Sequence, residues 1–127
     1  MMTTLLQVAA GGAVGASCRF LANVGMKALF GAGFPWGTLT VNILGSFLMG
    51  LLAVALERRG AMALAPFAMT GVLGGFTTFS AFSLDAVFLL EEGRTLVAVI
   101  YMAASVVVSI AALVAGLLLA RGMVTVP

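Results

Sequence analysis

The chain has no histidine and only one cysteine, Cys18, among its 127 residues. A metal site built from Cys and His ligands, a histidine general base and an intrachain disulfide framework are therefore all excluded. Charged residues make up only 8% of the chain, and no basic run accompanies its net charge of +2, so nothing favours nucleic-acid binding. Since no set of nucleophile, base and metal ligands can be assembled, an enzyme is the least expected class.

Apolar residues are what the chain has in excess. They make up 63% of the sequence, and the mean hydropathy of +1.26 belongs to the membrane class of proteins. The first ten residues lack the positive charges of a signal peptide and are expected to begin the first span. We therefore predict an all-α membrane protein, a single unit over residues 1–127, with four spans at about 4–30, 37–56, 61–90 and 95–120.

The stretch from Gly71 to Ser83 interrupts the third of these spans. It contains three glycines, two adjacent threonines, two serines and three phenylalanines. Glycine weakens a helix interior, and Ser and Thr offer the backbone competing hydrogen bonds. We predict a helix broken near its middle, and irregular backbone at membrane depth is tolerated only where it is buried in protein or lines a polar cavity. Such breaks indicate a permeation or binding site.

Polar side chains occur within the other spans. Arg19 in the first span either snorkels to an interface or attracts an anion. Asn42 is the one amide of the second span, and it is either an interhelical hydrogen-bonding residue or a donor that lines a path. In the fourth span Tyr101, Ser105 and Ser109 recur every four residues, which predicts a narrow polar stripe that drifts by about 40° per step.

Positive charges are balanced between the two sides of a four-span bundle: Arg58, Arg59 and Arg121 on one, and Lys27, Arg94 and the deeper Arg19 on the other. Because a bias in Lys and Arg sets membrane orientation, this balance predicts a chain that inserts both ways and pairs with an inverted copy about a two-fold axis. Alternatively, Arg19 lies too deep to count, and one orientation is weakly preferred.

Three segments carry a specific resemblance. They are Gly12 to Arg19 (GAVGASCR), Gly37 to Phe47 (GTLTVNILGSF) and Gly74 to Phe82 (GGFTTFSAF). In order and in four-span length, essentially the whole chain resembles the CrcB/Fluc family of fluoride channels. The resemblance implies an antiparallel, dual-topology homodimer in the bacterial plasma membrane, with two separate pores that pass fluoride passively out of the cell.

The resemblance also implies roles for particular residues. Phe79 and Phe82 would line the pores beside Asn42, and Arg19 would attract anions at a vestibule. A structural sodium ion, the one cofactor implied, would be held by the backbone carbonyls of Gly74 and Thr77. The hydroxyls of the fluoride pathway would come from Thr40, Ser80, Tyr101, Ser105 and Ser109.

Two positions depart from the family pattern. Ala81 stands where the family commonly has threonine, which removes one hydroxyl from the expected track. Asp85 stands where glutamate is frequent, which keeps the carboxylate but shortens its reach by one methylene.

The main rival is a small dual-topology, proton-coupled exporter of cationic drugs. Such a transporter needs a membrane-embedded carboxylate, normally in its first span. The first span here has an arginine and no acid, and Asp85 is the only acid away from the expected interfaces. A structural subunit of a larger assembly would explain the glycines but would leave the hydroxyls of residues 77–83 without a purpose.

Overall fold

The computed structural model describes residues 1–124, which are helical apart from short connections and contain no strand. The long helices are α1 (Met2–Phe30), α2 (Trp36–Arg58), α4 (Phe79–Glu91) and α5 (Thr95–Val124). Between α2 and α4 lie a 3₁₀ turn, η1 (Met62–Leu64), a π-helical segment, η2 (Pro66–Leu73), and the single turn α3 (Gly74–Phe76). Four segments of this range are long and apolar enough to cross a membrane: Met2–Phe30, Trp36–Arg58, Met62–Glu91 and Thr95–Met123.

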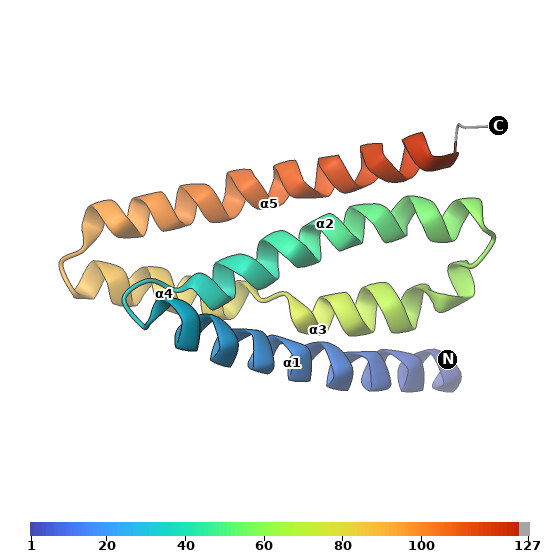
Figure 1. The fold of residues 1–127 in the computed structure, drawn as a ribbon. Helices are drawn as coiled ribbons and strands as arrows, with labels where there is room; N and C mark the ends of the chain where they lie inside the picture. The colour runs from blue at the N-terminus through green and yellow to red at the C-terminus, as the bar shows by residue number, and fades with distance from the viewer. Residues whose placement is uncertain (125–127) are drawn as a thin grey trace.

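The segments form an up-and-down bundle (Figure 1). The N-terminus, the C-terminal end of α5 and the α2–η1 connection lie at one end of the bundle, and the other two connections lie at the opposite end. Helix α2 packs against α5, α1 packs against η2 and α3, and α4 packs against α5. At the first end, Nη1 of Arg58 donates a hydrogen bond to the Arg121 carbonyl at 3.3 Å. Lys27 and Arg94 lie at the opposite end.

Helix α1 meets η2 backbone to backbone. Gly11 and Gly15 are buried against Gly71 and Val72, and a Cβ atom on Gly15 would overlap the Val72 carbonyl. Gly50 of α2 and Gly116 of α5 make a second contact of the same kind. Small residues permit such close helix approach in membranes. We call the contact between α1 and η2 the glycine seam.

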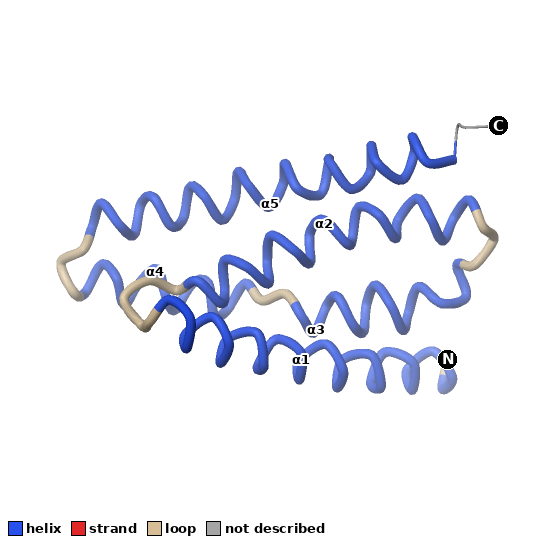
Figure 2. Tube along the Cα trace, viewed as in Figure 1, coloured by secondary structure: helices blue, strands red, loops and turns tan. Residues whose placement is uncertain are grey.

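The third span is bent between α3 and α4. Thr77 (φ −84°, ψ 159°) and Thr78 (φ −154°, ψ 121°) have extended backbone dihedrals, and Figure 2 shows them as a short non-helical segment. The Thr78 hydroxyl accepts a hydrogen bond from the Ala81 N–H at 3.2 Å and so caps the N-terminus of α4. The chain therefore leaves and re-enters helical geometry over two residues.

Side chains, rather than backbone, fill the bundle near the 31–35 and 92–94 connections. Ala86, Leu89, Ala98 and Tyr101 form a buried apolar cluster between α4 and α5. Phe34, Leu39, Phe82, Val97 and Met102 pack around it. This cluster supports one wall of the groove described next.

Candidate functional site

A groove of about 340 Å³ lies where α2, the bend, α4 and α5 meet. Six residues expected at a site from the sequence lie together along it: Asn42, Thr77, Phe79, Phe82, Ser105 and Ser109. The remaining lining residues are Ser46, Thr78, Val106 and Ile110. Residues from three helices and the bend thus converge on one concave surface.

Asn42 is hydrogen bonded to the bend at two points. Its Oδ1 accepts from the Thr78 N–H at 2.8 Å, and its Nδ2 donates to the Thr78 carbonyl at 3.0 Å. The side chain thereby satisfies both backbone groups that the extended conformation of Thr78 removes from helical pairing. An amide nitrogen carries two hydrogens, so one remains for the groove. Asn42 is an interhelical hydrogen-bonding residue that also lines the groove.

The hydroxyls of the third span have mostly local partners. Thr77 Oγ1 donates to the Leu73 carbonyl at 2.9 Å, and the Thr78 and Ser80 hydroxyls lie 3.4 Å apart. Ser83 Oγ donates to the Phe79 carbonyl at 2.9 Å. Ser80 is exposed and does not line the groove.

Ser105 and Ser109 differ from those hydroxyls. Their oxygens are buried on α5 at the wall of the groove, and neither has a hydrogen-bond partner among residues 1–124. A buried hydroxyl without a partner is costly, so it marks a place where a ligand or a water molecule binds. The two serines are the strongest indication of a polar ligand in the groove.

Phe79 and Phe82 form the aromatic side of the groove, with ring centroids 5.3 Å apart. Phe79 is 78% exposed, so the described residues leave the groove open at the molecular surface. Because a phenyl ring is negative on its face and positive at its edge, an anion can be held only against the ring edges.

Tyr101 lies behind the groove, outside its lining. Its side chain is fully buried, and its hydroxyl donates to Asp85 Oδ2 at 3.0 Å. This pair was not predicted from the sequence, although Asp85 and Tyr101 each lie eight residues from Gly93, on helices joined by a short turn. Residues equidistant from the turn of a helical hairpin lie at similar heights. Thr40, half-buried on α2, is also absent from the groove lining.

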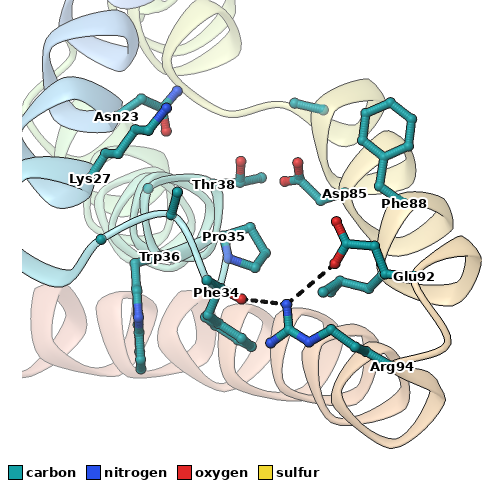
Figure 3. Close-up of a pocket in the computed structure, with 16 residues that line it drawn as sticks. Asn23, Lys27, Phe34, Pro35, Trp36, Thr38, Asp85, Phe88, Glu92 and Arg94 are labelled. Atoms are coloured by element: carbon teal, nitrogen blue, oxygen red, sulfur yellow. Dashed lines mark hydrogen bonds and ion pairs between the residues drawn. The ribbon is translucent and has the colours of Figure 1, made fainter.

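A second cavity, of about 420 Å³, lies at the end of the bundle that carries the 31–35 and 92–94 connections (Figure 3). Basic and acidic side chains line it together: Lys27 and Arg94, with Asp85 and Glu92. Arg94 Nη1 donates to the Gly33 carbonyl at 2.6 Å and lies 3.5 Å from Glu92 Oε2. The opposite charges offset one another, so this cavity is not purely basic.

Arg19 and Gly74 lie outside both cavities. Arg19 Nε donates to the Gly75 carbonyl at 3.1 Å, which gives the deep arginine a partner at the bend. Outside the helical hydrogen bonds, no donor within residues 1–124 reaches the carbonyls of Gly74 or Thr77. Over the same range no group of His, Cys, Asp and Glu suits a metal ion, so a cation would depend on carbonyl oxygens.

Comparison with known proteins identifies the family. Residues 6–117 match the family described as CrcB-like protein, Camphor Resistance (CrcB). A "Fluoride-specific ion channel FluC" of Cereibacter sphaeroides is 58% identical over 122 residues, covering 96% of this chain and 98% of that protein. Proteins of the same name are 56% identical in Ruegeria sp., over 98% of this chain and all of the relative, and 52% identical in Paracoccus denitrificans, over 97% and 98%.

These relatives are named as ion channels and not as enzymes, in agreement with the expectation from the sequence. Together with four segments that are able to span a bilayer, they indicate a multi-pass membrane protein. The resemblance noted in the sequence extends over nearly the full length of both chains. The chain belongs to the CrcB family.

Proposed function

We propose that the protein is a passive, selective fluoride channel that releases cytoplasmic fluoride across the bacterial plasma membrane. One observation carries the proposal: a groove lined by Asn42 and two phenylalanines also contains two buried serine hydroxyls without partners. The relatives are named as fluoride-specific ion channels, and this supports the choice of ion.

The chemistry of the groove suits a small, strongly hydrated anion. Dehydrating fluoride requires replacement donors, and the free Asn42 amide hydrogen and the hydroxyls of Ser105 and Ser109 supply them. The edges of Phe79 and Phe82 add weak positive potential. No fully charged side chain lines the groove, and this favours conduction, since binding must be weak enough for the ion to leave.

The remaining expected residues have roles beyond the groove lining in this proposal. Thr40 and Ser80 add hydroxyls where the path extends past the groove, and Tyr101 supports the wall behind Phe82. Arg19 contributes positive potential near the bend, in addition to its bond to the Gly75 carbonyl.

We further propose that two copies assemble in opposite orientations, so that each groove becomes one of two pores. The surface position of Phe79 supports this arrangement, as does the presence of basic residues at both ends of the bundle: Arg58 at one end, and Lys27 and Arg94 at the other. Two lysines added beside Arg58 should bias insertion and lower the yield of functional dimer. Full flux from a population shown to sit in a single orientation would exclude the antiparallel dimer.

A structural sodium ion fits the bend of the third span, which we take as its interruption at membrane depth. The carbonyls of Gly74 and Thr77 are hard oxygen ligands, and sodium is a hard cation. Bound there, the ion would satisfy backbone acceptors that lipid cannot. Exchange of sodium for a large organic cation should then lower the thermal stability of the purified dimer.

Efflux from liposomes tests the function. Purified protein is reconstituted, and fluoride and chloride electrodes follow both ions from the same vesicles. We expect rapid fluoride loss without chloride loss and without coupling to protons.

The same vesicles distinguish the rival function. Proton-coupled exchange of a cationic dye, in the absence of fluoride loss, would identify an exporter and direct attention to Asp85 in the second cavity. Asp85→Asn should abolish such exchange if the carboxylate carries the proton.

A further inference from the structure

Six aromatic rings form a continuous series from the 31–35 connection to the groove. Neighbouring ring centroids lie 4.7 to 5.5 Å apart along the whole series. In order, the series is Phe30, Trp36, Phe34, Tyr101, Phe82 and Phe79. An unbroken series of ring contacts thus joins the connection between α1 and α2 to the groove wall.

Tyr101 is the central ring of this series. Its side chain is fully buried, and its hydroxyl is bonded to Asp85. The Phe34 ring meets it edge to face, at 5.5 Å and an interplanar angle of 90°, and Phe82 packs against it at 5.4 Å. Phe82 lines the groove and packs against Tyr101, so the Tyr101 ring is one of the surfaces that position the Phe82 edge.

Phe34 is itself held in place although it belongs to a connection. The Gly33 carbonyl accepts a bond from Arg94 at 2.6 Å, and the Phe34 carbonyl accepts one from the Trp36 N–H at 2.8 Å. The Trp36 ring lies 4.7 Å from the Phe34 ring. These contacts hold the backbone on both sides of Phe34, so its ring is supported within the connection.

We propose that Phe34 is a positioning residue for ion selectivity: it braces Tyr101, which in turn holds the Phe82 ring edge at the width that suits fluoride. This inference rests on the proposed channel function. Phe34 lines the second cavity and not the groove, and it packs against the cluster that contains Tyr101, against which Phe82 also packs.

Phe34→Leu tests the proposal, with Phe30→Leu as the matched control. Phe30 is in the same ring series but touches only Trp36 among the rings, and it is 59% exposed. We expect the ratio of fluoride to chloride efflux to fall by about three- to tenfold in Phe34→Leu, the size expected for the loss of one edge-to-face contact. The ratio should be unchanged in Phe30→Leu. An unchanged ratio in both variants would overturn the role in selectivity.

A double variant tests whether Phe34 acts through Tyr101. In a Tyr101→Leu background, Phe34→Leu should add no further loss of selectivity, because the ring it supports is gone. Additive losses would mean that Phe34 acts by another route, and would overturn the proposed mechanism.

A third measurement does not depend on transport. Tyr101 is the only tyrosine of the chain, so isotope-labelled tyrosine gives the NMR signals of this ring alone. Ring flipping should be faster in Phe34→Leu than in wild type or Phe30→Leu. Unchanged flipping overturns the bracing role even if fluoride flux is normal, whereas faster flipping supports it even if the wild-type protein fails to conduct fluoride.

Discussion

The two halves of the third span are held in opposite ways. Before the bend, η2 contacts α1 through glycine backbone at Gly11, Gly15 and Gly71. After the bend, α4 contacts α5 through large side chains, with Phe82 and Leu89 around Tyr101. The first contact is made by glycine backbone at its closest points, and the second is made mostly by side chains that can change rotamer.

The two contacts are expected to have different roles: the contact of η2 with α1 stabilises the fold, and the contact of α4 with α5 shapes the proposed fluoride pathway. Backbone contact tolerates almost no added volume, because neither partner can move without bending a helix. Aromatic packing tolerates small losses by local rearrangement, and it lies next to the groove. We therefore expect substitutions before the bend to affect assembly, and substitutions after it to affect conduction.

Gly15→Val should have the largest effect of all. The new side chain would overlap the Val72 carbonyl, and we expect a loss of about 3 kcal/mol in stability, the upper end for overpacked cores. Thermal denaturation of the purified protein measures this loss. Gly25→Ala is the control, because a Cβ at Gly25 meets nothing within 4 Å. Equal stability of the two variants would contradict the glycine seam.

Asn42→Asp should weaken the contact between α2 and the bend, and it should abolish most conduction. An ionised carboxylate cannot donate to the Thr78 carbonyl, and its charge repels an anion in the groove. We expect fluoride flux in liposomes to fall by about 100-fold. Gln7→Glu makes the same amide-to-acid change outside the groove and should leave flux unchanged. Normal conduction by Asn42→Asp would remove that residue from the path.

Phe82→Ile should affect only the half of the third span that follows the bend, where α4 packs against α5 through side chains. The aliphatic side chain keeps apolar bulk but loses the positive ring edge, and flux should fall by about tenfold while the proposed dimer stays assembled. Electrode recordings and gel filtration on one preparation provide both readouts. The control is Phe20→Ile on exposed α1. Dissociation without a change in flux per dimer would assign Phe82 to packing instead.

Ser105→Ala should have the smallest effect, and one confined to transport. The hydroxyl has no partner to lose within residues 1–124, so thermal stability should change by less than about 0.5 kcal/mol. Fluoride flux should fall by about three- to fivefold, as for the loss of one neutral hydrogen bond. The combined variant with Ser109→Ala should fall further. Destabilisation at unchanged flux would show that the hydroxyl serves the fold.

Much of the helical arrangement follows from the sequence, because bilayer thickness ties span length to apolar runs. The serine positions follow as well: Ser105 and Ser109 share a helical face and line the groove. Tyr101, expected in the same stripe, lies behind the groove against Asp85. The drift of about 40° per four-residue step explains this, since it turns the first member of the stripe away from the last.

Contacts between distant segments were beyond the reach of sequence patterns. The two bonds between Asn42 and Thr78 depend on how α2 packs against the bend, and periodicity gives only the face on which Asn42 lies. The role of Phe34 depends on a connection fixed by Arg94 from another turn. The π-helical geometry of Pro66–Leu73, which packs closely against α1, was likewise not predicted from the sequence.

The two-point bond between Asn42 and Thr78 also constrains how this protein can evolve. One amide bonds α2 to the bend and, in the proposed channel, offers its second hydrogen to the groove, so a substitution at that position is expected to change the bond to Thr78 as well as the ion path. A lineage that changed its ion preference here would need a compensating change near Thr78 at the same time. The hydroxyls of Ser105 and Ser109 make no such bond within residues 1–124. Substitutions at these two positions are therefore expected to change ion selectivity one at a time, without a compensating change elsewhere.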